Sequence, residues 1–376
     1  MRRILTSFII ISVFLLSACG GKEYAYLSNA QPTDSLTFRY ASLIRYYHYP
    51  RYDVAEVRNP WDTTTVLHRY VLVPRSSILP DSLPKGTLIR TPLQRAVAFS
   101  SVHCGLLDQL KTLHAIVGVC DVPYVLLPTV LKGVSNGSIR NMGSSLSPDV
   151  ERILAVKADG LLVSPYEKCN FSILEKTRLP VIECADYMET SAMGRAEWMR
   201  FYGRLFGRAA QADSLFIEVE RRYNAIKKMV RKQQAPSLLV DRIDGAVWYV
   251  PGGHSTMGRI FQDAGANYLF ANFKKNGSVP LSFEQVYQTA RNADIWVMKY
   301  GQKVDLTYTA LSKEDRYCQF DAYKHRRVYG CNTDHVPFYE EAPFRPDVLL
   351  RDIMHVLYPS LFPPNEPYRF YLPLNE

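Results

Sequence analysis

AAQADSLFIEVERRYNAIKKMVRKQ, residues 209–233, is the stretch that decides how this chain of 376 residues is organised. It contains no Pro or Gly, and its apolar residues recur at short helical intervals: Ala212, Leu215, Phe216, Val219, Tyr223, Ile226 and Val230. This spacing predicts an amphipathic helix about 36 Å long, at about 1.5 Å per residue, which Pro236 ends. Because similar patterns lie on both sides, we expect a rigid connector between two lobes; an ordinary helix within one large α/β domain is the alternative.

Short β-rich runs alternate with helical runs on both sides of this helix. Strands are expected at residues 95–100, 115–120, 160–165, 180–184, 237–243, 246–251, 294–300 and 326–331. One of the helices between them is expected to open with Ser147 as N-cap and Pro148 in its first turn. The alternation predicts the α/β class: two Rossmann-like lobes with parallel-rich sheets, joined by one long helix, with a cleft between the lobes.

The N-terminus has the pattern of an export signal. A basic start, MRR, precedes an apolar run over residues 4–16 that is too short to span a bilayer comfortably, and the letters LSAC follow and end at Cys19. These four letters resemble the lipobox of bacterial lipoproteins, in which the Cys is lipidated and becomes the new N-terminus. We therefore expect a signal peptide over residues 1–18 and a lipid anchor on Cys19, outside the cytoplasm.

Composition divides the rest of the chain. A lipidated N-terminus and flexible spacer is expected over residues 19–37, and a small antiparallel β element packed on the first lobe over 38–92. The remaining divisions are an N-terminal lobe over 93–207, the connecting helix over 208–234 and a C-terminal lobe over 235–376. Gly207 is the expected break before the connector.

Charge and cysteines exclude some functions. The net charge of +9 is scattered or paired on helices rather than gathered in one dense run, which argues against nucleic-acid binding. No pair of cysteines forms a CxxC motif, so a structural zinc site is not expected. Disulfides and buried free thiols both remain open, as does the pairing, for Cys104, Cys120, Cys169, Cys184, Cys318 and Cys331.

Two segments carry a family resemblance. The run NMGSSLSPDVERILAVKADGLLVSP, residues 141–165, resembles a segment of class III periplasmic binding proteins, the iron-siderophore and vitamin B12 type. The matching residues are Pro148, Glu151, Ile153, Lys157 and Asp159, whereas Ala158 replaces the usual Pro. SFEQVYQTARNADIWVM, residues 282–298, repeats the resemblance through Ser282, Glu284 and Asp294. The resemblance covers about residues 93–358.

The resemblance implies a function. Members of that family capture an iron complex or a corrinoid between two lobes and deliver it to the permease of an ABC importer with a cytoplasmic ATPase. An acidic side chain on each lobe docks onto permease arginines; Glu284 matches in the second lobe, and Glu167 is our choice in the first. We expect a monomeric periplasmic lipoprotein with no intrinsic cofactor, anchored in the inner membrane, with the outer membrane as the alternative.

The ligand site is argued from chemistry. Ligands of open parallel sheets bind at the carboxyl ends of the strands, and a large chelate with apolar faces favours aromatic side chains with a few polar groups. The candidates at expected strand ends are Ser100, Ser101, His103, Tyr124, Tyr166, Tyr187, Trp248, Tyr249, His254, Tyr300, Phe338, Tyr339 and Arg345. An iron-siderophore complex, haem and cobalamin are all compatible with these residues.

Two other classes of function are weighed. Direct binding of Zn²⁺ or Mn²⁺, or an axial bond to haem, could use His103, His254 or His335 with Asp121 or Asp334. A cell-envelope hydrolase is less favoured, because no GxSxG, Walker or HExxH motif is present. We therefore expect a binding protein rather than an enzyme.

Overall fold

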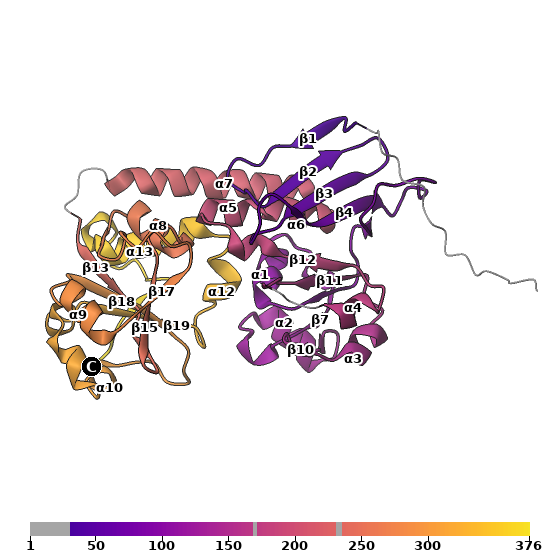
Figure 1. The fold of residues 1–376 in the computed structure, drawn as a ribbon. Helices are drawn as coiled ribbons and strands as arrows, with labels where there is room; N and C mark the ends of the chain where they lie inside the picture. The colour runs from indigo at the N-terminus through magenta and orange to yellow at the C-terminus, as the bar shows by residue number, and fades with distance from the viewer. Residues whose placement is uncertain (1–30, 168–170, 231–234) are drawn as a thin grey trace, which may run out of the picture.

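The computed structural model describes residues 31–167, 171–230 and 235–376, which form two α/β lobes side by side beneath one long helix (Figure 1). This arrangement confirms the predicted fold class. Cys19, the signal segment and Cys169 lie outside the described residues.

The long helix is α7 (Ala209–Lys227), which runs along the top of both lobes (Figure 1). It packs on α6 (Met199–Leu205) of the first lobe and on α13 (Pro346–Leu357) of the second. Gly207, with φ of +69°, turns the chain just before α7, a conformation that glycine adopts without steric cost. The buried positions of α7 follow the predicted apolar stripe: Ala212, Phe216, Val219, Tyr223 and Ile226.

The N-terminal lobe has a fully parallel sheet in the order β12-β11-β6-β7-β8. Its strands are β6 (Ala96–Ala98), β7 (Ile116–Val119), β8 (Arg140–Asn141), β11 (Gly160–Val163) and β12 (Val181–Glu183). Its helices are α1 (Ser101–Gln109), α2 (Pro128–Ser135), α3 (Val150–Ala155), α4 (Ser172–Glu175) and α5 (Ala192–Glu197).

The expected helix start at Ser147 is wrong. Ser147–Pro148 is strand β10, which pairs with β9 (Gly143–Ser144) as a short hairpin. The N-cap of α3 is Asp149, whose side chain accepts a hydrogen bond from the N–H of Arg152. Asp is as good an N-cap as Ser, so the two candidates could not be separated by residue type.

The C-terminal lobe repeats the architecture with the order β16-β13-β18-β19-β20, in which only β20 is antiparallel. The strands are β13 (Ser237–Val240), β16 (Asn267–Tyr268), β18 (Ile295–Tyr300), β19 (Val328–Asn332) and β20 (Leu372–Pro373). The helices are α8 (Thr256–Asp263), α9 (Phe283–Ala290), α10 (Tyr308–Leu311), α11 (Asp321–Lys324), α12 (Phe338–Glu341) and α13.

A separate antiparallel sheet accompanies the C-terminal lobe. It holds β14 (Ile243–Asp244), β15 (Val247–Pro251) and β17 (Ser278–Leu281). The predicted strand at residues 246–251 therefore exists but does not join the parallel sheet. The side chain of Trp248 in this strand is fully buried, and its ring centroid lies 5.9 Å from that of Trp296 in β18.

A five-stranded sheet precedes the N-terminal lobe and lies beside the first part of α7 (Figure 1). Its strands are β1 (Asp34–Leu36), β2 (Ile44–His48), β3 (Asp53–Arg58), β4 (Val66–Pro74) and β5 (Thr87–Thr91). Strands β1 to β4 are antiparallel neighbours, whereas β5 is parallel to β4, a departure from the expected antiparallel element.

Two buried carboxylates attach this sheet to the lobe. Glu197 accepts hydrogen bonds from the backbone N–H groups of residues 39–41 at 2.7–3.0 Å. Glu189 accepts from the N–H groups of residues 42 and 43 and from the indole N–H of Trp198, each at 2.9 Å. Charge-assisted bonds of this kind are about twice as strong as neutral ones. Two carboxylates of the lobe therefore hold the connection between β1 and β2.

We predict that Glu197→Ala loosens the five-stranded sheet. Three backbone N–H groups lose their acceptor, at about 1–3 kcal/mol for each buried group, so the free energy of unfolding should fall by about 3 kcal/mol. Denaturant unfolding measures this loss, and limited proteolysis should cut residues 31–92 faster than in the wild type.

Glu218→Ala is the matched control. Glu218 is an exposed carboxylate on α7 that pairs with Arg222 one turn away, and such pairs contribute about 0.3–0.5 kcal/mol. Equal stability and equal protease resistance of the two variants would show that Glu197 does not hold the sheet.

Candidate ligand-binding site

A cavity of about 420 Å³ opens at the carboxyl ends of β6, β7 and β11. The chain runs from β6 outward through β7 to β8, then returns to the other side of β6 with β11 and β12. The order of strands therefore reverses between β6 and β11, and such a switch point is where open α/β sheets bind ligands. The segments just after these strands supply most of the lining.

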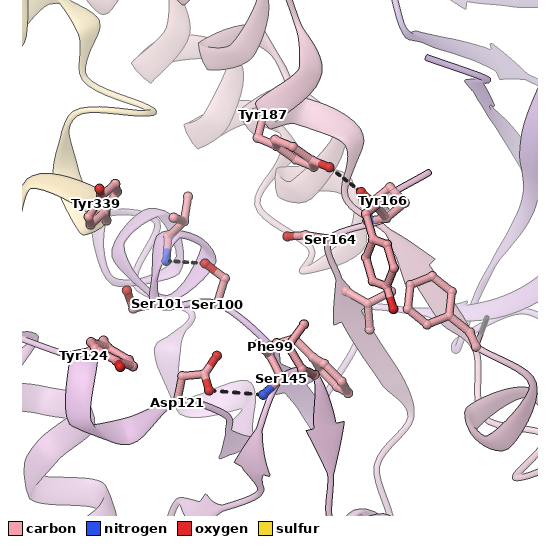
Figure 2. A pocket seen from close by; sticks show the side chains of 15 residues that line it. Phe99, Ser100, Ser101, Asp121, Tyr124, Ser145, Ser164, Tyr166, Tyr187 and Tyr339 are labelled. Carbon is pink, nitrogen blue, oxygen red and sulfur yellow. Dashed lines mark hydrogen bonds between the residues drawn. The ribbon is translucent and has the colours of Figure 1, made fainter. Parts of the chain in front are cut away.

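Aromatic and hydroxyl side chains dominate the lining (Figure 2). Four tyrosines surround the opening and keep 40–75% of their surface exposed, so their rings are available to a ligand: Tyr124, Tyr166, Tyr187 and Tyr339. The other lining residues are Phe99, Ser100, Ser101, Val102, Asp121, Ser145, Leu146, Val163, Ser164, Pro165 and Phe171.

Local backbone structure sets the polar groups of the cavity. Ser100 is the N-cap of α1, and its hydroxyl accepts from the N–H of Val102 at 3.3 Å. The start of α1 therefore faces the cavity with hydroxyls and helix N-terminal N–H groups. Tyr187 donates its hydroxyl to the carbonyl of Pro165, which ties the loop after β12 to the loop after β11 (Figure 2).

The C-terminal lobe reaches the cavity through α12. Figure 1 shows this helix between the lobes, and it packs on α1. A Cβ at Gly105 would lie 1.9 Å from the backbone oxygen of Glu340, so only glycine permits this contact. The buried Glu340 carboxylate also accepts the N–H of Leu126 at 2.9 Å. These contacts place Tyr339 at the cavity opposite Tyr187 (Figure 2).

Six of the thirteen predicted ligand residues thus surround one cavity: Ser100, Ser101, Tyr124, Tyr166, Tyr187 and Tyr339. Their role in binding stays a prediction. The other seven lie elsewhere in the structure.

His103 is buried on α1 and belongs to an ion-pair network. Its Nε2 lies 3.1 Å from Asp186, which also accepts from Arg195 at 3.1 Å and from the Tyr202 hydroxyl at 2.7 Å. Burial disfavours a charged imidazole, but Cys184 and the hydrogen bond to Asp186 outweigh it and raise the pKa of His103 to about 10. Although burial alone would raise the pKa of Asp186, His103 and Arg195 lower it. The network joins α1, α5 and α6, and the buried His103 side chain does not line the cavity.

The other six do not line the cavity. Trp248 and Phe338 are in the core, whereas Tyr249 is 47% exposed on β15 and His254 is exposed before α8. Tyr300 lines a different hollow in the C-terminal lobe. Arg345 forms two bonds of 2.9 Å to Asp347 and lines a groove between α7 and α13.

The metal alternative gains no support from the described residues. Nowhere among them do three His, Cys, Asp or Glu side chains come together to hold a metal ion. His335 instead pairs with Asp305 at 2.9 Å. Five cysteines in the described ranges are free thiols: Cys104, Cys120, Cys184, Cys318 and Cys331. No helix in these ranges is long and apolar enough to cross a membrane.

Both predicted docking carboxylates are exposed. Glu284 lies in the first turn of α9. Ser282 and Gln285 form a capping box at the N-terminus of this helix. Hydrogen bonds from its own backbone N–H and from Ser282, with Arg316 nearby, lower the pKa of Glu284. Glu167 follows Tyr166 in the turn after β11, at the rim of the cavity. Their docking role stays a prediction.

Some lining residues were not predicted individually. Phe99, Val102, Val163, Ser164 and Pro165 flank strands whose ends were expected. Ser145 and Leu146 come from the β9–β10 hairpin, and the Gly-Ser-Ser run that ends at Ser145 is the turn signal that could have located it.

Comparison with known proteins identifies the family. Residues 103–334, more than half of the chain, match the family described as periplasmic binding protein. The chain belongs to the periplasmic binding protein family. This confirms the resemblance drawn from the sequence, and the five-stranded sheet over residues 34–91 precedes the matched part.

Similar proteins come from several organisms. An uncharacterized lipoprotein of Methanocaldococcus jannaschii is 24% identical over 290 residues, 73% of this chain and 67% of that protein. The periplasmic haem-binding protein of Vibrio cholerae aligns with a TM-score of 0.58 and 15% identity, over 71% of this chain and 99% of that one. A molybdate-binding protein of Haemophilus influenzae aligns with a TM-score of 0.58 and 17% identity, over 73% and 89%. At these identities the two solved structures show the shared fold alone.

We predict that Gly105→Val separates α1 from α12. The new side chain would collide with the Glu340 backbone, so this binding protein should lose about 1–3 kcal/mol of stability by overpacking, and Tyr339 should move away from the cavity. Thermal unfolding measures the first effect, and quenching of tyrosine fluorescence by a bound chelate measures the second.

The matched control is Gly277→Ala, because a Cβ there meets nothing within 4 Å. If Gly105→Val unfolds at the same temperature as Gly277→Ala, the contact between α1 and α12 is not tight in solution.

Proposed function

We propose that this chain is the substrate-binding component of an ABC importer and captures a metal chelate in the cavity between its lobes. The candidate chelates are an iron-siderophore complex, haem and cobalamin or a related corrinoid. After capture, the loaded protein would deliver the chelate to the permease, and a cytoplasmic ATPase would drive import.

One observation carries this proposal: the tyrosine-rimmed cavity of about 420 Å³ at the strand switch point, to which both lobes contribute. Its size falls in the range of small-molecule sites, about 300–1,000 Å³. Exposed tyrosines present flat apolar faces together with hydroxyl groups. A chelate with apolar faces and oxygen-rich edges complements that combination better than a bare metal ion, which needs converging ligands.

Membership of the periplasmic binding protein family and the M. jannaschii lipoprotein relative support the location that we propose. In this proposal Cys19 carries the lipid, the residues between Cys19 and β1 act as a spacer, and the monomeric body works in the periplasm at the inner membrane. The V. cholerae relative by fold binds haem, and the H. influenzae one binds molybdate. The fold therefore accepts different ligands, and the cavity itself must decide.

A ligand screen tests the function. The full-length chain, purified in detergent, should be stabilised against heat by at least one of cyanocobalamin, haemin, ferrichrome and ferrioxamine. Ligand at 100 times its Kd adds about 2.7 kcal/mol to the free energy of unfolding. Native mass spectrometry should show one ligand per chain, and Tyr187→Ala should weaken the same complex. Binding of molybdate or of bare Zn²⁺ alone would overturn the chelate proposal.

We predict that Glu284→Lys and Glu167→Lys impair delivery but not capture. Each carboxylate is solvated in the free protein and would gain charge-assisted bonds only against permease arginines. Transport into proteoliposomes that contain the permease and ATPase should fall tenfold or more, while the Kd for the ligand stays within twofold.

Glu218→Lys is the control, because Glu218 is also an exposed carboxylate on a helix but lies outside both matched segments. Transport that stays at the wild-type rate in both docking variants would remove Glu284 and Glu167 from the interface.

A further inference from the structure

One charged side chain stands out in a cavity otherwise lined by hydroxyl and apolar groups. Asp121 directly follows β7 and Cys120, and its φ of +54° lies in the left-handed region that Asp tolerates better than most residues. Its Oδ1 accepts the N–H of Ser145 at 3.1 Å (Figure 2). This bond and the backbone conformation hold the carboxylate at the cavity wall.

No described residue balances this charge within the cavity. The described lining contains no Lys, Arg or His, and Asp121 forms no ion pair with any described cation. Arg195 is bonded to Asp186, the residue before Tyr187. The Lys299 ammonium lies 5.0 Å from the ring centroid of Phe338, the residue before Tyr339. Arg195 and Lys299 therefore interact with residues outside the lining, and neither of them lines the cavity.

The remaining polar groups suit neutral oxygen atoms. Hydroxyls of Ser100, Ser101 and Ser164 can donate to amide or hydroxamate oxygens. An anionic chelate would find these donors but would also face the Asp121 carboxylate across a partly dehydrated cavity, where like charges repel strongly. A cationic chelate would gain from the same carboxylate.

We propose that Asp121 makes the cavity selective for metal chelates of neutral or positive net charge, such as ferric trihydroxamates and corrinoids, over anionic chelates such as haem and ferric catecholates. This inference rests on the proposed function and names the charge class of its substrate. Asp121 is a specificity-determining residue of the site in this scheme.

The test compares ligands of different charge on full-length wild type and on Asp121→Asn. Asn keeps the acceptor for the Ser145 N–H and tolerates the left-handed backbone, so the variant removes the charge and little else. The probes are cationic ferrioxamine B, neutral ferrichrome and cyanocobalamin, and anionic haemin and ferric enterobactin. Kd is measured by fluorescence quenching at low and high salt.

The wild type should bind the neutral and cationic probes at least tenfold tighter than the anionic ones. Asp121→Asn should weaken ferrioxamine B about tenfold, leave the neutral probes within threefold and strengthen the anionic ones. High salt should weaken ferrioxamine B in the wild type but not in the variant, because screening acts on the charge that Asn lacks. Glu151→Gln, which removes an exposed carboxylate on α3, should match the wild type throughout.

Three outcomes would overturn the inference. Anionic probes that bind the wild type as tightly as neutral ones would do so, as would an Asp121→Asn variant that weakens all probes equally. Lys168 lies outside the described residues, so Lys168→Gln is measured in parallel. The third outcome is that the wild type binds anionic chelates tightly and that Lys168→Gln abolishes this binding. Failure of every chelate to bind would instead contradict the proposed function.

Discussion

A tight contact between the lobes is the one on which the cavity depends. At Gly105, α1 of the N-terminal lobe touches the backbone of α12 from the C-terminal lobe, and no side chain could be added there without moving one of the helices. The buried Glu340 carboxylate holds the same helix to the N–H of Leu126. Because Tyr339 is the neighbour of Glu340, the second lobe contributes its aromatic ring only while this contact persists.

The five-stranded sheet is also held to the N-terminal lobe by contacts with backbone groups. It precedes the residues that match the family, and it is joined to the lobe by backbone N–H groups of residues 39–43 that point at two carboxylates. Burying Glu189 and Glu197 without such partners would be costly, since an isolated buried charge loses its hydration. The N–H groups of residues 39–43 therefore stabilise the two buried carboxylates, and the carboxylates in turn hold the sheet on the lobe. This part of the chain is integral to the body rather than an appended linker.

Sequence predicted well what depends on local spacing. The apolar stripe of residues 209–230 and the strands expected at residues 95–100, 115–120 and 160–165 all follow from patterns within a few residues. The sequence did not predict the direction in which individual side chains point. Trp248 and His103 stand at the expected places, but burial against Trp296 and pairing with Asp186 decide where their side chains point. Neither partner lies nearby in the chain, so no local pattern could have shown it.

The contacts between the lobes limit how they can move. A single helix such as α7 would leave the lobes free to twist about its axis, but further links cross between them. One is the contact of α1 with α12, and another is the bond from the Thr256 hydroxyl to the Glu189 carbonyl at 3.0 Å. Links at separate points restrain that twist. The exposed side chains of Tyr124 and Tyr166, which take no part in either link, are then the parts of the cavity best placed to change rotamer around a ligand.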